Sequence, residues 1–386
     1  MARKLGSYVI EREIGRGGMG EVLLARHERL GRPVILKRTL RGLAGRDELA
    51  ERLEREARAA GMVHHQNVVA VYDLFTHRGA RYIAQEYVAG VDLAGALLCE
   101  GPFPWEIAAR IGLEVARGLE AVHAHGTLHR DLKPANLLLG RNGAVKIGDF
   151  GLALDANATP LTQPGVVVGT PAYMAPEQLR CGPTDARTDL FAWGCVVYEM
   201  LTGRPPFYPP GPATTNCPPL SPAALTARIE RIERGDYHSV RRAAHGVPRR
   251  FARLIARCLR ARTTRRPATT QQVRQTLEAM LNEASPADCQ EKLAGWLRRH
   301  GLVEPTTGDT ALDLTAPLTG NAPRGLRPWA AAAALAAAAA ALTLAGPKHL
   351  TGLLEDTTST ARELGHHWTQ PRPGETTTEH STRLAP

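Results

Sequence analysis

Short apolar runs of strand length recur along residues 8–90. The stretch 46–63, between the third and fourth runs, has helical periodicity instead. The five runs are YVIEREI, EVLLARH, PVILKR, VVAVYDLF and RYIAQEYV. This pattern predicts a small strand-rich unit that contains one helix.

Helical periodicity takes over after residue 90. The elements that the pattern predicts are helices within 92–125, short strands near 137–139 and 145–147, and helices from about 175 to 283. In the segment TDLFAWGCVVYEMLTG, Thr188 is the candidate N-cap and Gly203 the residue that ends the helix. A small strand-rich lobe followed by a larger helical lobe predicts an α+β architecture with a crevice between the lobes.

The residues after 283 have a different composition. Residues 284–328 predict a linker with one candidate short helix, ADCQEKLAGWLRRHGL, and the Thr-, Pro- and His-rich tail 347–386 predicts disorder. Between them, residues 329–346 carry no charge, and as a helix they would span about 27 Å, against about 30 Å for a bilayer core. Because twelve of these residues are alanine, a single membrane span and a soluble alanine-rich helix both remain open.

The overall composition excludes two classes of protein. With 43% hydrophobic and 22% charged residues, the chain is neither wholly disordered nor fibrous. Its six cysteines form no CxxC pair, which disfavours a zinc site or a disulfide framework. The N-terminal stretch MARKLGSYVIEREIG lacks the apolar core of a signal peptide. These features favour a reducing, cytosolic location for the first part of the chain.

Much of the positive charge is concentrated in one short region. Ten arginines and no acidic residue lie between Arg241 and Arg266, in a chain whose net charge is +10. On a helix, one face would carry Arg249, Arg253, Arg257 and Arg260, and another Phe251, Leu254, Ile255, Cys258 and Leu259. The pattern favours a solvated amphipathic surface helix. A patch that binds nucleic acid or an acidic partner is the alternative.

A glycine-rich stretch lies at the start of the strand-rich unit. Residues 14–22 read IGRGGMGEV, which contains the pattern GxGxxG. The stretch joins two strand-like runs rather than a strand and a helix, and this argues against a dinucleotide-binding fold. Glycines here let backbone N–H groups approach phosphates. Lys37 ends a following apolar run and needs a partner, which Glu56 can supply; an edge-strand lysine is the alternative interpretation.

Three further motifs follow in order: HRDLKPAN at 129–136, DFG at 149–151 and APE at 175–177. Together with the glycine-rich stretch and the strand lysine, this ordered set resembles the protein kinase family, and most closely the bacterial Ser/Thr kinases that are similar to eukaryotic ones. The resemblance covers residues 8–283. It implies the two-lobed protein kinase fold, with an N-lobe over about 8–90 and a C-lobe over about 91–283.

The resemblance implies roles for the polar residues of these motifs. Asp131 matches the catalytic base, and Lys133 the lysine that reaches the γ-phosphate of ATP. Lys37 matches the lysine that holds the α- and β-phosphates once Glu56 has positioned it. The implied metal ligands are Asn136 and Asp149. Their hard oxygen atoms suit Mg²⁺, with Mn²⁺ as the alternative ion.

An ATP site is implied in the same way. Its residues are Ile14, Gly15, Gly17, Gly20, Val22, Ile35, Lys37, Gln85, Glu86, Val88, Asp92 and Leu138. Gln85 matches the gatekeeper, and the backbones of Glu86 and Val88 match those that bind adenine. Asp92 falls where the family contacts the ribose. Ile35 departs from the family, which usually has alanine at this place, and two more branches there would narrow the adenine pocket.

Three threonines between the DFG and APE motifs are candidate phosphorylation sites. Thr162 is the first choice for autophosphorylation and Thr159 the second. Thr170 matches the threonine that contacts the catalytic aspartate and lysine in the family. The resemblance also implies two structural contacts, an ion pair between Glu177 and Arg266 and a hydrogen bond from the catalytic-loop backbone to Asp189.

The resemblance implies that the chain is an ATP- and Mg²⁺-dependent protein Ser/Thr kinase of bacterial signal transduction that phosphorylates itself. The expected partners are ATP, Ser/Thr-containing proteins and a second copy of the chain, but no nucleic acid. Because ATP is cytosolic, the kinase domain is expected in the cytoplasm, held at the cell membrane by a single span at 329–346. The alternative is a nucleotide-binding pseudokinase scaffold, and Ile35 is the only feature that favours it. A small-molecule kinase is disfavoured by the HRDLKPAN and APE motifs.

Overall fold

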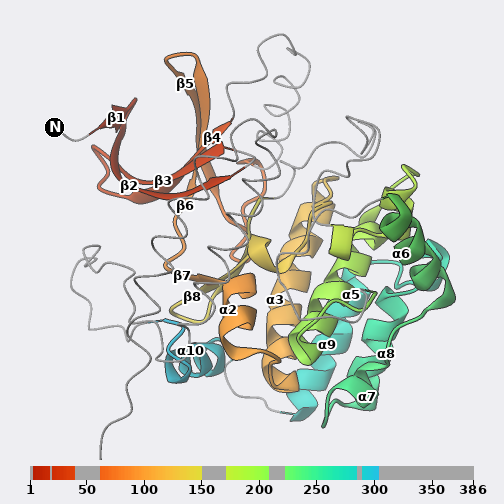
Figure 1. Ribbon diagram of the computed structural model, residues 1–386. Helices are drawn as coiled ribbons and strands as arrows, with labels where there is room; N and C mark the ends of the chain where they lie inside the picture. Colours follow the sequence, from red (N-terminus) through yellow and green to blue (C-terminus); the bar gives the residue numbers. More distant parts are fainter. Residues whose placement is uncertain are drawn as a thin grey trace, which may run out of the picture. The chain divides into compact units, whose positions relative to one another are not determined.

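The computed structural model describes residues 3–17, 20–39, 61–149, 171–207, 222–284 and 289–303. All of them belong to one unit, Met1–Thr307, and the second unit, Gly308–Pro386, lies outside the described residues. The described residues form a curled antiparallel sheet, followed along the chain by a helical lobe (Figure 1). The predicted α+β architecture of two lobes is confirmed.

Six strands form the N-terminal sheet. They are β1 (Lys4–Leu5), β2 (Tyr8–Gly17), β3 (Gly20–His27), β4 (Pro33–Thr39), β5 (Val71–His77) and β6 (Ala80–Glu86), in the spatial order β1-β2-β3-β4-β6-β5. The β5–β6 hairpin turns at Arg78 and Gly79, whose φ angles of 49° and 71° match the twist of the strands they join. The stacked rings of Tyr8, Phe75 and Tyr82 fill one face of the sheet.

A second, three-stranded sheet flanks the predicted catalytic loop, which is the HRDLKPAN segment at residues 129–136. Its strands are β7 (Gly90–Asp92), β8 (Leu137–Gly140) and β9 (Val145–Ile147), in the order β7-β8-β9. The last two lie where the sequence predicts them. A Cβ atom at Gly90 would lie 1.9 Å from the carbonyl oxygen of Leu139, so the close approach of β7 to β8 requires glycine there.

The helical lobe is built around one central helix, α5. Its helices are α2 (Leu93–Glu100), α3 (Trp105–Ala124), α4 (Pro176–Leu179), α5 (Ala186–Thr202), α6 (Pro222–Arg234), α7 (Val240–Ala243), α8 (Arg249–Cys258) and α9 (Thr270–Ala284). Every residue of α5 from Thr188 to Leu201 is buried. Such burial on all sides explains why α5 lacks the apolar and polar faces of a surface helix. The predicted amphipathic character of α8 is confirmed, because Phe251, Leu254, Ile255 and Cys258 are buried and the arginines of α8 are exposed.

The N-cap of α5 corrects one prediction. The cap is Asp185 and not Thr188, because Asp185 has extended backbone angles and its side chain accepts a hydrogen bond from the backbone N–H of Arg187 at 2.8 Å. Thr188 is already the third helical residue, and its hydroxyl group accepts from the Asp185 backbone N–H at 3.3 Å. At the other end, the predicted stop is confirmed, since Gly203 adopts a φ of 77°.

A further helix, α10 (Cys289–Arg299), follows α9 and packs against the helical lobe. It is the short helix predicted within 284–328. The ring of Trp296 lies 4.6 Å from that of Phe103. At the turn between β8 and β9, a Cβ atom on Gly143 would lie 2.0 Å from the carbonyl oxygen of Gln290. The fit between this turn and α10 is therefore too close for any side chain at Gly143.

Some predicted segments lie outside the described residues. They are most of the helix at 46–63 with Glu56, the segment 150–170 with Thr159, Thr162 and Thr170, and the alanine-rich stretch 329–346. Among the helices that the structure describes, none combines the length and the apolar character needed to cross a membrane.

Candidate active site

Three of the predicted site residues form one hydrogen-bonded cluster on the loop between α3 and β8. The Lys133 Nζ atom donates to Asp131 Oδ2 at 2.7 Å. The amide nitrogen of Asn136 donates to the backbone oxygen of Asp131 at 2.8 Å and to its Oδ2 atom at 3.2 Å. Because both contacts use the nitrogen of Asn136, its Oδ1 atom is the one suited to a cation.

The buried carboxylate of Asp189 binds the backbone of this loop. It accepts hydrogen bonds from the backbone N–H groups of His129 and Arg130 at 2.9 and 2.8 Å, and it contacts the His123 ring at 2.7 Å. Burial acts to raise the pKa of Asp189, but its hydrogen bonds and electrostatic interactions with His123 and His129 outweigh burial and lower the pKa. Asp189 therefore stays ionised and fixes Arg130 in its left-handed conformation, with a φ of 65°. The predicted contact of Asp189 is confirmed.

Asp149, two residues after the end of β9, lies beside the catalytic loop. The backbone N–H of Gly148 donates to the oxygen of Asn136 at 2.8 Å, and the His129 ring contacts the Gly148 oxygen at 3.1 Å. Asp149 has a φ of 55°, and its Oδ1 atom accepts a hydrogen bond from Lys37 Nζ. The structure thus brings together five of the predicted residues, namely Lys37, Asp131, Lys133, Asn136 and Asp149. Glu56 lies outside the described residues.

The predicted adenine-site residues lie on adjoining strands. Val22 on β3 pairs with Lys37 on β4, Ile35 pairs with the buried Gln85 on β6, and Asp92 on β7 pairs with Leu138 on β8. Five apolar side chains in this set are only partly buried or exposed: Ile14, Val22, Ile35, Val88 and Leu138. Apolar surface left accessible in this way is suited to a flat apolar ring.

The strand that carries the predicted hinge is anchored through Glu86. Its backbone N–H donates to the oxygen of Ala70 at 2.8 Å, and its carboxylate accepts from Lys146 Nζ at 2.9 Å. Asp92 already has one contact, because its side chain caps α2 by accepting from the Gly95 backbone N–H at 2.8 Å. At the glycine-rich hairpin, Gly17 pairs with Gly20, and a Cβ atom on Gly15 would meet no atom within 4 Å. Packing against the described residues therefore does not require a glycine at position 15.

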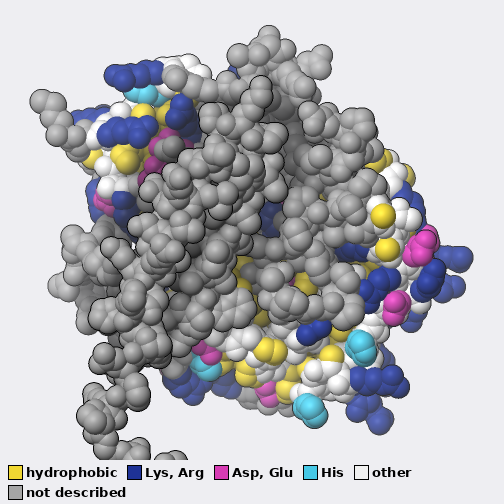
Figure 2. Space-filling model, in the orientation of Figure 1, with side chains coloured by type: hydrophobic (Ala, Val, Ile, Leu, Met, Phe, Trp, Pro, Cys, Tyr) yellow, Lys and Arg dark blue, Asp and Glu magenta, His cyan; other side chains and the backbone are white. Residues whose placement is uncertain are grey.

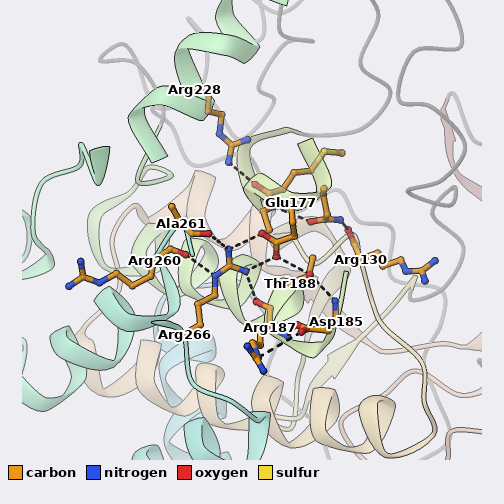
Figure 3. A network of polar contacts seen from close by, with 12 residues as sticks. Arg130, Glu177, Asp185, Arg187, Thr188, Arg228, Arg260, Ala261 and Arg266 are labelled. Carbon is orange, nitrogen blue, oxygen red and sulfur yellow. Dashed lines mark hydrogen bonds and ion pairs between the residues drawn. The ribbon is translucent and has the colours of Figure 1, made fainter. Parts of the chain in front are cut away.

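The predicted ion pair between Glu177 and Arg266 is confirmed and forms the centre of a larger network (Figure 3). The Arg266 side chain is fully buried, and its two terminal nitrogens donate to the Glu177 carboxylate at 2.6 and 2.9 Å. Its other three N–H groups donate to the backbone oxygens of Arg187, Arg260 and Ala261. All five guanidinium donors therefore have an acceptor.

Gln178 joins this network to the catalytic loop. Its amide nitrogen donates to the backbone oxygen of Arg130 at 2.8 Å, and its amide oxygen accepts from the backbone N–H of Ala175 at 3.0 Å. The side chain of Arg130 extends away from the ion pair (Figure 3). Sequence reasoning missed Gln178 because nothing in its local pattern shows that it reaches across 48 positions. It also missed the buried Glu199, whose carboxylate accepts from the Tyr173 hydroxyl at 2.6 Å.

Comparison with known proteins matches residues 8–277 to the family described as "Protein kinase domain". The chain is 42% identical over 206 residues to "Serine/threonine-protein kinase PknB" of Mycobacterium leprae, which covers 52% of this chain and 33% of that protein. It is 33% identical over 320 residues to "Probable serine/threonine-protein kinase pknA2" of Bifidobacterium longum, and these residues cover 82% of this chain and 39% of that protein.

A third relative is "Serine/threonine-protein kinase PknL" of Mycobacterium tuberculosis. It is 35% identical over 255 residues, which cover 66% of this chain and 60% of that protein. The chain thus spans about a third of the length of the PknB relative and less than two thirds of the others named.

Proposed function

The chain belongs to the protein kinase family, and from this premise we propose that it transfers the γ-phosphoryl group of ATP to Ser or Thr hydroxyls of protein substrates. The observation that carries the proposal is the cluster of Asp131, Lys133 and Asn136 beside Asp149, whose carboxylate contacts Lys37. Phosphoryl transfer requires in-line placement of the reactants and cancellation of charge, and little covalent help. Two acids, two lysines and one amide from three segments of the chain are proposed to supply those requirements.

Asp131 is the residue proposed to orient the substrate hydroxyl. Its Oδ2 atom already accepts from Lys133 and Asn136, so its Oδ1 atom is the one that accepts the hydroxyl proton. The ammonium group of Lys133 is proposed to contact the transferred phosphoryl group as a point charge. The two contacts to Oδ2 hold the carboxylate in one orientation, which is what proximity catalysis needs.

The donor set fits a divalent cation with a preference for oxygen. Asn136 Oδ1 and the Asp149 carboxylate are hard oxygen ligands, and the Asp149 side chain is 36% exposed. We assign Mg²⁺ to this pair, with Mn²⁺ as an acceptable substitute. When bound, the cation would neutralise phosphate charge. Lys37 is proposed to hold the α- and β-phosphates of ATP, and Glu56 to support Lys37.

The adenine ring is assigned to the apolar surface of Val22, Ile35 and Leu138, next to the backbone of Glu86 and Val88. The larger side chain of Ile35 is expected to weaken ATP binding relative to the usual alanine. Calorimetry on the Ile35→Ala variant should then show tighter binding of ATP in the presence of Mg²⁺. Unchanged affinity would remove Ile35 as a determinant of nucleotide binding.

The decisive experiment is phosphoryl transfer from labelled ATP to a generic Ser/Thr substrate. The wild-type chain should be active with Mg²⁺, and Asp149→Ala should abolish the transfer while circular dichroism shows an unchanged fold. The matched control is Asp236→Ala, since Asp236 is an exposed carboxylate paired only with Arg231 in the described residues. A wild-type chain that binds ATP but transfers no phosphate would instead identify a pseudokinase scaffold.

Autophosphorylation is proposed on the segment between the DFG and APE motifs, with Thr162 first, Thr159 second and Thr170 as a substrate-side contact. A second copy of the chain would act on this segment in trans. Thr162→Ala should slow the rise of activity during incubation with ATP. A mass spectrum of the active wild-type protein without phosphate on Thr162 would refute that assignment.

A membrane anchor is proposed for residues 329–346, with the kinase domain on the cytoplasmic side because ATP is there. Support comes only from the uncharged sequence, flanked by Trp329 at its start. Extraction of membrane fractions with carbonate tests the proposal. An anchored chain stays in the pellet, whereas complete release into the supernatant would refute the span.

A further inference from the structure

A large basic groove lies in the helical lobe, away from the catalytic loop residues. Its volume is about 1550 Å³, and it is lined by the end of α6, by α7 and α8, and by the segment that follows α8. One wall is formed by Glu177 and Arg180, at and just after α4. We call it the arginine groove. Figure 2 shows Lys and Arg side chains gathered along the right-hand edge of the molecule, where α6, α7 and α8 lie in Figure 1.

Seven of the lining arginines have no ion pair within the part of the chain that the structure describes. They are Arg241 and Arg242 on α7, Arg249 and Arg253 on α8, and Arg260, Arg262 and Arg265 beyond it. All seven are exposed. In Figure 3 the guanidinium group of Arg260 points away from the buried network, although its backbone oxygen accepts from Arg266. The donors of these side chains therefore face the groove or the solvent.

The acidic residues of the groove do not compensate this charge. The lining contains two of them, Glu177 and Glu233. The Glu177 carboxylate is bound by the buried Arg266, and Glu233 pairs with Arg180. Like charges held close together repel one another, and an anionic ligand that enters the groove relieves this repulsion. Arginine is also the side chain that binds carboxylates with two parallel hydrogen bonds.

The lining of the groove favours a polypeptide over a single-stranded nucleic acid. It also contains the apolar residues Ile232, Val240 and Leu259, which are buried. Single-stranded nucleic acids bind on exposed aromatic rings. Tyr237 is the aromatic residue of the described lining, and its ring is already packed edge-on against Tyr198 and Phe207. Acidic side chains on a peptide backbone match the exposed arginines of this lining.

We propose that the arginine groove docks an acidic segment of a protein substrate. The inference rests on the proposed kinase function, and it concerns which proteins the chain phosphorylates. The groove borders α4, whose Gln178 binds the backbone of the catalytic loop. A segment bound there would raise the effective concentration of the attached Ser or Thr hydroxyl near Asp131.

Binding is tested first, without catalysis. The full-length chain is titrated against a fluorescein-labelled, glutamate-rich peptide, and anisotropy gives the affinity. Arg249→Glu combined with Arg253→Glu should weaken binding by about tenfold or more, a change of about 1.4 kcal/mol in binding free energy. The matched control is Arg298→Glu combined with Arg299→Glu on α10, which changes the net charge equally but lies outside the groove. The control should bind the peptide within about twofold of the wild-type chain.

Three results would overturn the proposal. The first is that the wild-type chain shows no binding of the peptide, and the second is that the groove and control variants lose peptide affinity equally. The third result is a single-stranded oligonucleotide that binds the wild-type chain more tightly than the peptide does and that the groove variant no longer binds. If the double glutamate variant fails to fold by circular dichroism, Arg249→Gln with Arg253→Gln replaces it, because glutamine is a good helix former. Unchanged peptide affinity in a folded glutamine variant also refutes docking in the groove.

A second arm separates the groove from the proposed function. The KM for a Ser-containing peptide is compared with the KM for the same peptide carrying the glutamate-rich segment. The wild-type chain should show a KM about tenfold lower for the extended peptide, and the groove variant should lose that ratio. Equal KM values for the two peptides would refute substrate docking. If the acidic peptide binds as expected but neither peptide is phosphorylated, the kinase function fails while the acidic-peptide site stands.

Discussion

Removing Arg266 is predicted to cause a large loss of stability. Its guanidinium group is fully buried and donates all five of its N–H groups to the Glu177 carboxylate and to three backbone oxygens. The side chain also stacks on Phe191, at 4.9 Å from the ring centroid. Arg266→Ala leaves the Glu177 carboxylate, 11% exposed, without its cation.

The expected magnitude follows from this burial. Removing one partner of a buried ion pair costs about 3–5 kcal/mol, because the remaining charge is desolvated and unpaired. A domain of this size loses about 2–4 °C in Tm for each kcal/mol, so Arg266→Ala should lower the Tm by about 10 °C. Arg266→Lys keeps the charge but offers three donors to five acceptors. It should therefore cost about 2 kcal/mol, since each hydrogen bond contributes about 1 kcal/mol net.

Thermal denaturation followed by circular dichroism measures both variants against a neighbouring control. Arg265→Ala removes an exposed arginine and should change stability by no more than about 0.5 kcal/mol. The double variant with Glu177→Gln should be less destabilised than the sum of the two single changes, because the pair is coupled. Strict additivity, or an Arg266→Lys variant that melts with the wild-type chain, would contradict the account of the network.

Two further predictions concern a buried carboxyl group and a close backbone approach. Burial raises the pKa of Glu199 to about 7 from its ordinary value of 4.5, so its stabilising protonation is complete below pH 4.5 and is lost as the pH rises through 7. Glu199→Gln should then melt above the wild-type chain at pH 8 but not at pH 5, and parallel melting curves at both pH values would refute this. Gly143→Val should displace α10, because its Cβ atom would meet the Gln290 oxygen, and hydrogen exchange in 289–299 should rise. Gly126→Ala, at a similar φ of 69° with no atom near its Cβ position, should leave α10 protected, and equal exchange in both variants would contradict the close fit.

Elements with a strong local signal were predictable from the sequence. The strands β2 to β6 and the helices α3, α5 and α8 follow from apolar periodicity that spans each element. The short strands β1 and β7 were missed, because two or three residues cannot establish a period and exist only through pairing with β2 and β8. The N-cap of α5 was misplaced by three positions, because Asp and Thr both favour that role and only the backbone angles decide between them.

In the candidate site, too, residues within one motif were predictable from the sequence, and contacts between distant residues were not. Asp131, Lys133 and Asn136 lie within one loop, so a motif reveals all three. The contact between Lys37 and Asp149 joins residues 112 positions apart, and the network that joins His123 to Asp189 spans 66. Gln178 and Glu199 carry no motif at all. Their roles depend on which backbone and side-chain groups the fold places opposite them, and a single sequence does not show this.

The catalytic loop is held by two buried polar side chains, those of Asp189 and Gln178. The loop needs an irregular backbone, with Arg130 at positive φ, and apolar packing cannot orient individual N–H groups. Hydrogen bonds do so, and they are strongest where water is excluded. Asp189 fixes the N–H groups of His129 and Arg130 from one side, and Gln178 binds the Arg130 oxygen from the other. Gln178 lies on α4 next to Glu177, which is paired with Arg266 and also lines the arginine groove, so the hydrogen bonds that fix the loop adjoin the groove.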